Sequence, residues 1–224
     1  MSRILSLALI GLLLCATQAF AAPLKISIIG AGNVGGTLGT LWAKAGHPVM
    51  FSSRHPEELA SLVKAAGANT QAGSVADAVA WGDVIVLSVP YAAMPALAEQ
   101  LKGKLAGKVV LSTSNPFPGR DGDVGRKAVE QGVALADQQY LPGVHLVRAF
   151  NAIGYGSMKS QSGQGKAIPT FADDDQARKV GAQLVQDAGF TPVLLPLARA
   201  NEGLPGGAVS GVSTEAELKQ KLGL

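Results

Sequence analysis

The sequence predicts an α/β fold with a doubly wound, mostly parallel sheet, and three observations support this. Short runs of β-branched and aliphatic residues alternate with segments whose apolar residues recur at helical spacing. Strands separated by helices in this way are typical of βαβ units, which build parallel sheets. The composition, with 47% hydrophobic residues, 16% charged residues and 28 glycines in 224 residues, indicates a globular chain with many turns and excludes a disordered one.

The first 21 residues have the three-part organisation of a secretory signal peptide. Arg3 gives a positive start, an apolar run extends from Ile4 to Cys15, and the small residues Ala19 and Ala21 precede a cleavage position. The apolar run is shorter than the about 20 residues that span a bilayer. We therefore predict cleavage after residue 21 and a periplasmic or secreted protein. An N-terminal segment that is retained as a membrane anchor is the alternative.

Seven segments after this signal are predicted strands, because each is a short, mainly apolar run that is bounded by glycine, proline or polar residues. They cover residues 24–29, 47–52, 83–89, 108–113, 145–150, 169–172 and 191–195. The run at 83–89 is apolar on both faces, which is typical of a strand at the centre of a parallel sheet.

Helices are predicted between these strands, where apolar residues fall on one helical face. They cover residues 34–45, a segment that begins at 56–58, and residues 74–81, 90–101, 126–136, 173–188 and 213–222. Gly46 and Gly82 are placed to end the first and third of these helices. Acidic residues at 173–175 are placed to cap the start of the sixth helix, so we interpret them as structural.

The segment Gly30-Ala31-Gly32-Asn33-Val34-Gly35 fits the motif G-x-G-x-x-G and stands between the first strand and the first helix. There the first glycine permits a tight turn, the second lets a pyrophosphate approach, and the third lets helix and strand pack closely. Helix N–H groups then face the phosphates. We predict a Rossmann dinucleotide-binding domain over residues 22–200, followed by a tail with a short helix at 201–224. A glycine-rich turn of another α/β fold is the alternative.

The end of the second strand indicates which dinucleotide is bound. An NAD site places an acid there to bind the ribose 2′-hydroxyl, but this stretch has no acid before Glu57. Ser53 and Arg54 can instead donate hydrogen bonds to a 2′-phosphate. We therefore predict NADP(H) as the cofactor. Solvation of Arg54 on the surface is the alternative.

Several motifs together resemble the family of NADP oxidoreductases that depend on the deazaflavin coenzyme F-420. These motifs are GAGNVGG, FSSR, LSVPYAAM, STSNP and VRAFNAIG, and the likeness covers most of residues 25–199. The same module resembles the N-terminal domain of pyrroline-5-carboxylate reductases and the cytosolic domain of six-transmembrane ferric reductases. The resemblance implies that residues 88–90, with Val89 and Pro90, lie beside the nicotinamide ribose, and that Asn115 and Pro116 flank the nicotinamide. The signal segment and the glycine-rich tail depart from the family.

Other chemistry has little support in the sequence. His47, His55 and His145 lack the spacing of metal ligands, and Cys15 is the one cysteine, so we expect no metal site. The net charge of +3 is small and scattered, so we expect neither nucleic acid nor, beyond the signal, a membrane as a partner. The sequence leaves the oligomeric state open, a homodimer included.

Five residues are candidates for the wall of an acceptor pocket, with packing in the core as the alternative. They are Phe117, Phe150, Asn151, Ile153 and Met158.

These observations predict an NADPH-dependent oxidoreductase that transfers hydride between NADP(H) and a small planar acceptor, a flavin or deazaflavin. No residue is assigned as an acid–base catalyst, because the nicotinamide carries the chemistry and the protein orients the two rings. A non-catalytic NADP-binding or interaction module is one alternative, and a reductase of a small imine is another.

Overall fold

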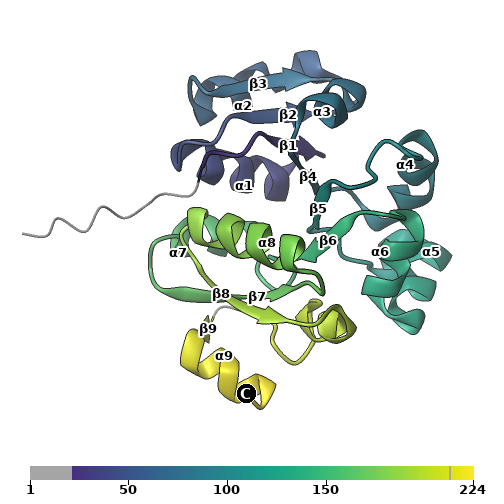
Figure 1. Cartoon of the computed structure of the whole chain (residues 1–224), viewed down its shortest axis with the longest axis vertical. Coiled ribbons are helices and arrows are strands. Elements are labelled where there is room, and N and C mark those ends of the chain that lie inside the picture. Colours follow the sequence, from purple (N-terminus) through teal and green to yellow (C-terminus); the bar gives the residue numbers. More distant parts are fainter. Residues whose placement is uncertain (1–21, 212) are drawn as a thin grey trace, which may run out of the picture.

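A computed structural model describes residues 22–211 and 213–224, in which one sheet carries helices on both faces (Figure 1). The strands are β1 (Ile26–Ile29), β2 (Val49–Ser52), β3 (Thr70–Gly73), β4 (Val84–Leu87), β5 (Val109–Ser112), β6 (His145–Arg148), β7 (Lys166–Phe171), β8 (Thr191–Leu195) and β9 (Ser213–Thr214). Their order is β3-β2-β1-β4-β5-β6-β7-β8, and β9 pairs with β7. The pairs from β3 to β6 and the pair β7–β8 are parallel, whereas β7 runs antiparallel to β6 and β9. The predicted doubly wound α/β fold is confirmed.

The helices divide between the two faces of this sheet. They are α1 (Asn33–Lys44), α2 (Ala60–Ala66), α3 (Val75–Trp81), α4 (Met94–Gln100), α5 (Pro118–Gln131), α6 (Val133–Tyr140), α7 (Tyr155–Gln161), α8 (Asp175–Asp187) and α9 (Glu215–Leu222), with short 3₁₀ helices η1 (Pro56–Leu59), η2 (Tyr91–Ala93) and η3 (Leu197–Gly203). Buried residues of α1, α2, α7 and α8 pack in one core, and those of α3, α4, α5, α6 and α9 pack in the other.

Side-chain alternation along the central strands supplies both cores. Ile28 and Val86 belong to the core under α1 and α8, whereas their neighbours Ile29 and Leu87 belong to the opposite core. The central strands are apolar on both faces because helices bury the sheet from both sides. The strand order is built outward in opposite directions from β1 and β4, which are parallel neighbours at the centre of the sheet. Ligands of such sheets bind at the carboxyl ends of the strands beside this switch point.

Some elements differ from the sequence prediction. The prediction of one helix at 126–136 is wrong. The helix α5 begins earlier, at Pro118, and a break at Gly132, which has a φ of +98°, separates α5 from α6. Gly122, with a φ of +58°, kinks α5 internally. The strand β3 and the helix α7 were not predicted. The residues of β3 are partly or fully exposed, so they carry no apolar pattern.

The described chain starts beside α8. The side chain of Gln183 donates a hydrogen bond to the carbonyl of Ala22, at 3.2 Å. The N–H of Leu24 donates to Nδ1 of His47, whose Nε2 lies 2.9 Å from Asp187. The predicted signal segment, residues 1–21, lies outside the described residues. None of the helices in the described part of the chain is long and apolar enough to span a membrane.

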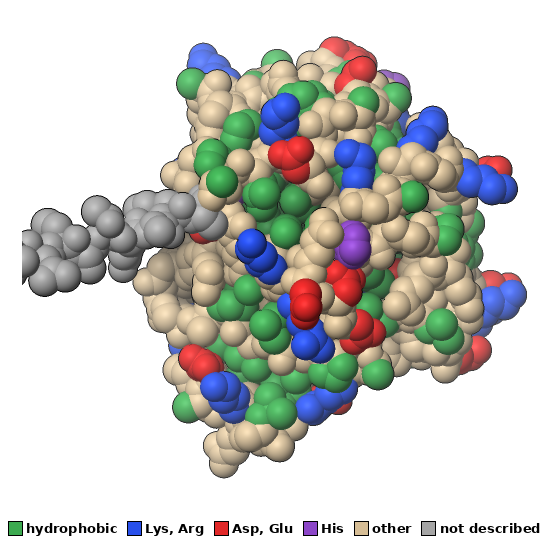
Figure 2. Space-filling model, in the orientation of Figure 1, with side chains coloured by type: hydrophobic (Ala, Val, Ile, Leu, Met, Phe, Trp, Pro, Cys, Tyr) green, Lys and Arg blue, Asp and Glu red, His purple; other side chains and the backbone are tan. Residues whose placement is uncertain are grey.

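Charges on the surface are mixed in sign. On the face shown in Figure 2, lysine and arginine side chains lie among aspartate and glutamate side chains and do not gather into one basic area.

Candidate functional site

The three glycines of the motif differ in what a side chain at each position would meet. Gly30 has a φ of +97°, and a Cβ there would lie 2.3 Å from the carbonyl oxygen of Ser88. A Cβ on Gly35 would lie 2.2 Å from the carbonyl oxygen of Gly30. A Cβ on Gly32, in contrast, would meet no protein atom within 4 Å. Packing within the protein therefore requires the first and third glycines, whereas the second faces open space that a ligand can use.

The start of α1 is suited to an anion. Gly32 is the N-cap residue and offers no side-chain cap, and the first turn contains no acidic residue. The N–H of Gly36 makes the first helical hydrogen bond, to the carbonyl of Gly32 at 2.7 Å. The N–H groups before it lack intrahelical acceptors, and the helix dipole favours negative charge at this end. The loop and the helix start thus fit the pyrophosphate of a dinucleotide.

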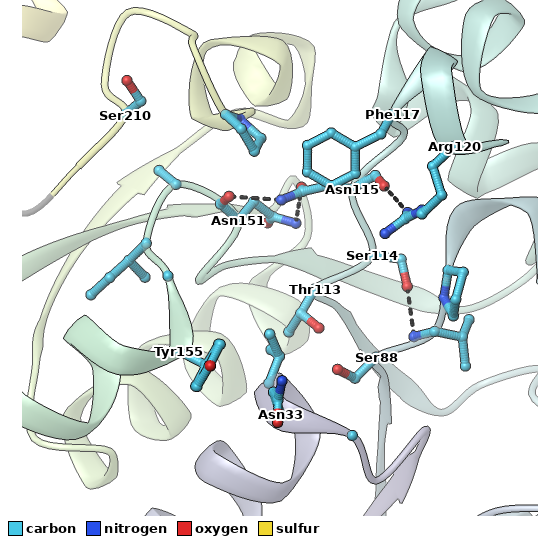
Figure 3. A pocket seen from close by; sticks show the side chains of 18 of the residues that line it. Asn33, Ser88, Thr113, Ser114, Asn115, Phe117, Arg120, Asn151, Tyr155 and Ser210 are labelled. Atoms are coloured by element: carbon cyan, nitrogen blue, oxygen red, sulfur yellow. Dashed lines mark hydrogen bonds between the residues drawn. The ribbon is translucent and has the colours of Figure 1, made fainter. Parts of the chain in front are cut away.

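A cavity of about 560 Å³ opens beside this loop, over the carboxyl ends of β4 and β5 (Figure 3). Its walls come from five segments: the loop and start of α1, the segment after β4, the segment after β5, the segment after β6, and the tail. The lining residues are Gly32, Asn33, Val34, Ser88, Val89, Pro90, Thr113, Ser114, Asn115, Phe117, Arg120, Asn151, Ala152, Ile153, Gly154, Tyr155, Pro205, Gly206 and Ser210.

The structure brings six of the predicted site residues to this cavity, namely Gly32, Asn33, Val34, Val89, Pro90 and Asn115. Gly30 and Gly35 are not among the lining residues, and a Cβ at either position would clash with the backbone. Pro116 is buried next to Asn115 and is not among the lining residues.

Ser53 and Arg54 lie outside the cavity, directly after β2. The N–H of Gly30 bonds the carbonyl of Ser52 at 3.2 Å, so the end of β2 adjoins the glycine loop. Arg54 is exposed, and the hydroxyl of Ser53 accepts a hydrogen bond from the N–H of His55. Both residues are therefore at the edge of the sheet where a 2′-phosphate was predicted, and within the described chain the Arg54 guanidinium makes no salt bridge.

The candidate acceptor wall divides into two groups. Phe117, Asn151 and Ile153 line the cavity. Phe150 and Met158 are buried in the core, as the alternative interpretation expected, and Phe150 makes edge contacts with two other aromatic rings.

Two asparagines interlock at the centre of the cavity wall (Figure 3). The side-chain nitrogen of Asn115 donates to the carbonyl of Asn151 at 2.8 Å. The side-chain nitrogen of Asn151 donates to Oδ1 of Asn115 at 3.0 Å and to the carbonyl of Ser112 at 3.3 Å. Oδ1 of Asn151 is buried and has no hydrogen-bond partner among the described residues. An unsatisfied buried acceptor beside a cavity suits a ligand that carries an N–H group, as the carboxamide of nicotinamide does.

The backbone next to this asparagine is strained. Phe150 has a φ of +64°, a left-handed conformation that is uncommon for a bulky residue. Strain of this kind persists where the surroundings fix it, and it is concentrated at functional sites.

A buried ion pair lies behind the cavity wall, and no local pattern in the sequence predicts it. Arg148 and Asp137 are fully buried and bonded to each other, and Arg148 also donates to the carbonyl of Ser114 at 2.9 Å. The hydroxyl of Tyr91 donates to Asp137 at 2.7 Å. Burial and the neighbouring carboxylate raise the pKa of Tyr91 far above its ordinary value, so the phenol stays protonated. The hydroxyl of Ser114 in turn accepts from the N–H of Val89 at 3.2 Å, which joins the pair to the cavity wall.

Metal ligands do not gather in the described part of the chain, where no group of three or more His, Cys, Asp or Glu side chains could hold an ion. The acids at 173–175 are structural: Asp174 caps α8, and Asp173 accepts the N–H of Leu197.

The fold and the site together define a Rossmann domain whose glycine loop fits the pyrophosphate of a dinucleotide. Comparison with known proteins gives a narrower class. Residues 25–116 match the family described as NADP oxidoreductase coenzyme F420-dependent, so the predicted resemblance is confirmed over this segment. This match supports the predicted class, an NADP-dependent oxidoreductase with NADP(H) as cofactor.

One known relative matches over most of this chain. The rat (Rattus norvegicus) metalloreductase STEAP3 is 27% identical over 188 residues, which cover 81% of this chain but 36% of the relative. The chain therefore spans about a third of the length of this relative.

Solved structures share the fold. A hypothetical protein from Sinorhizobium meliloti has a TM-score of 0.70 and 28% identity, over 84% of this chain and 95% of the other. A protein from Arthrobacter sp. that is described as an F420-dependent NADP reductase has a TM-score of 0.63 and 21% identity, over 80% and 87% of the two chains.

Proposed function

We propose that the protein is a reductase that passes a hydride from NADPH to a small planar acceptor, a flavin or a deazaflavin. The observation that carries the proposal is the continuous cavity, which starts at the open position of Gly32 and reaches Phe117 and Ile153 beyond the ends of β4 and β5. A dinucleotide with its pyrophosphate at Gly32 would extend its nicotinamide toward Asn115, and the apolar wall would bound a second ring.

The proposed step conserves electrons and protons. NADPH loses one hydride, which carries two electrons, from C4 of its ring and becomes NADP⁺. The acceptor ring gains that hydride and becomes its reduced anion, which can take a proton from water. The contribution of the protein is to bind both rings face to face and to exclude competing reactions.

The lining of the cavity favours an acceptor of this kind. Among the described lining residues, Arg120 and Tyr155 are the only titratable ones, and no carboxylate, imidazole or ammonium group reaches the cavity. Reduction of an imine or a carbonyl needs a positioned proton donor. Among the described lining residues Tyr155 carries a phenol that could serve as such a donor, but its side chain is about half exposed. Hydride transfer to a flavin-like ring needs no donor, so we rank the imine alternative second.

We also propose that Ser53 and Arg54 recognise the 2′-phosphate of NADPH. Both residues directly follow β2 at the edge of the sheet beside the glycine loop, and the guanidinium of Arg54 is exposed.

We also propose that the protein is exported and cleaved after residue 21. N-terminal sequencing of the protein from a periplasmic fraction should then start at Ala22, and a soluble protein that starts at Met1 would contradict export.

The test of the function is a stopped-flow assay of NADPH oxidation with lumiflavin, riboflavin, a deazaflavin and a cyclic imine as acceptors. Oxidation that depends on a flavin or deazaflavin is expected. Oxidation with the imine alone would favour the imine reductase alternative. Tight NADPH binding without oxidation by any acceptor would favour the non-catalytic module.

A further inference from the structure

The acceptor side of the cavity contains one charged side chain, that of Arg120, among the described residues that line it. Arg120 stands in the first turn of α5, and Figure 3 shows its guanidinium turned toward the cavity beside Asn115 and Ser114. Its side chain is 47% exposed, so a ligand can reach it.

The protein fixes this guanidinium in one orientation. Nε and Nη2 donate to the two carboxylate oxygens of Asp121, both at 2.8 Å. Nη2 also donates to the carbonyl of Asn115 at 2.9 Å, and the guanidinium carbon lies 4.8 Å from the ring centre of Phe117. These contacts use the N–H groups of Nε and Nη2. Within the described residues, the two N–H groups of Nη1 have no protein acceptor.

Asp121 is what makes this orientation firm. Its side chain is fully buried, and it also accepts the N–H groups of Phe117 at 2.8 Å and of Ala92 at 3.2 Å. Burial favours the neutral carboxyl, but the hydrogen bonds from Arg120 and from the two backbone groups outweigh it and hold the pKa of Asp121 below its ordinary value. An ionised carboxylate with four donors is a rigid anchor for an arginine that is itself half exposed.

We propose that Arg120 binds an anionic group of the acceptor, so that the acceptor is an aromatic ring system bearing a phosphate or a carboxylate. The inference rests on the proposed function. Its physical basis is the combination of an oriented donor pair on Nη1 with the half-exposed ring of Phe117, which offers an apolar face to a planar molecule. Arginine binds oxyanions through such fixed N–H groups, and orientation in advance lowers the entropic cost of binding.

Two other roles for Arg120 make different predictions. If the arginine bound a phosphate of NADPH, its loss would weaken NADPH itself. If it served only to neutralise Asp121, its loss would reduce stability and impair all acceptors equally. A role in binding the acceptor anion changes the ratio between two acceptors that differ only in that group.

The experiment compares riboflavin with its 5′-phosphate, which share one ring system and differ in charge. Binding of each flavin to the protein saturated with NADP⁺ is measured by quenching of flavin fluorescence, and KM is measured where turnover occurs. The variants are Arg120→Gln and Arg120→Lys. Arg126→Gln is the matched control, because Arg126 is on the same helix, half exposed and outside the cavity.

The wild-type protein is expected to bind the phosphorylated flavin about 10-fold more tightly than riboflavin, the lower end of the range for a hydrogen bond to a charged group because the site is partly exposed. Arg120→Gln should abolish this preference and leave riboflavin and NADPH affinities unchanged, and Arg120→Lys should retain part of it. The control should behave as wild type. Equal binding of the two flavins by the wild-type protein, or an equal loss for both flavins in Arg120→Gln, would overturn the inference.

The binding readout keeps this result separate from that for the proposed function. A phosphate preference that depends on Arg120 but occurs without NADPH oxidation would support the subsite and refute the proposed reaction. Oxidation of NADPH by both flavins at equal KM would support the reaction and refute the subsite.

Discussion

Replacing Gly32 by valine should remove nucleotide binding while it leaves the fold intact. The backbone at Gly32 has a φ of −76°, which any residue adopts, and a Cβ there meets no protein atom within 4 Å. Valine is a poorer N-cap residue than glycine, by about 1 kcal/mol. In a chain of this size that corresponds to a fall in Tm of about 2–4 °C.

The loss of affinity should be much larger. The γ-methyl groups of valine would occupy the space through which a pyrophosphate reaches the N–H groups at the start of α1. Hydrogen bonds to charged groups contribute about 1.5–3 kcal/mol each, so the loss of two of them weakens NADPH by about 100-fold or more.

Calorimetric titration with NADPH and thermal melts of the free protein separate the two effects. Gly35→Val is the matched control, because its Cβ would lie 2.2 Å from the carbonyl oxygen of Gly30 and must disturb the loop and α1. We expect Gly32→Val to lose affinity with a small change in Tm, and Gly35→Val to lose much more Tm. An NADPH affinity within about twofold of wild type in a folded Gly32→Val protein would refute the assignment of the loop to the pyrophosphate.

Three further predictions concern cofactor choice, the buried ion pair and acid stability. Arg54→Ala should weaken NADPH about 10-fold at low salt and leave NADH nearly unchanged, because the exposed guanidinium serves only the 2′-phosphate; equal losses in calorimetry would make Arg54 structural. Ser53→Asp should invert the preference, whereas Ser52→Asp should destabilise the fold, because Ser52 is fully buried and bonds the carbonyl of Ile28. Arg148→Met should lower the free energy of unfolding, measured in urea, by about 3–5 kcal/mol, because the carboxylate of Asp137 stays buried without its cationic partner. Adding Asp137→Asn to this variant should recover part of the lost stability. A double variant that is no more stable than Arg148→Met would contradict this explanation. The folded pKa of Asp121 is depressed, so its contribution to stability is present above about pH 4 and is lost as the pH falls through the folded pKa. The difference in Tm between wild type and Asp121→Asn should therefore shrink from about pH 7 to about pH 3, and a constant difference would argue against an ionised Asp121.

The elements around the glycine loop were predictable because their signals are local. The run of β1, the glycines and the apolar stripe of α1 are consecutive in the sequence, and each has one structural explanation. The capping roles of Gly82 and Asp174 were also predictable from the sequence, because a capping residue acts on the adjacent turn of its helix.

Elements whose stability depends on distant residues were not predictable. β3 consists of Thr-Gln-Ala-Gly at the edge of the sheet, and it is a strand only because β2 supplies its partner in the register Val49 to Thr70. The division between α5 and α6 depends on the left-handed conformation of Gly132, and glycine alone does not reveal its φ.

The support of the site was hidden for a similar reason. Arg148 is the last residue of β6, where an arginine is usually exposed, and its partner Asp137 is on the helix α6. The tail residues Pro205, Gly206 and Ser210 line the cavity because Gly211 bonds the carbonyl of Ala152 at 2.8 Å, a contact between distant parts of the chain. A pattern confined to neighbouring residues indicates neither pairing.

Different parts of the chain therefore indicate the cofactor and the acceptor. The match to the NADP oxidoreductase family ends at residue 116, and Phe117, the next residue, is the first of the wall on the acceptor side. Similarity thus informs the half of the cavity made by the glycine loop, β4 and β5, where the dinucleotide was predicted. The other half comes from residues 117–155 and from the tail, outside the matched segment, so we infer what it accepts from its own chemistry: an oriented Arg120, the apolar ring of Phe117 and Tyr155 as the one phenol among the described lining residues. We propose that these groups favour a planar, anionic acceptor, and this proposal can fail in experiment without any change in the identity of the cofactor.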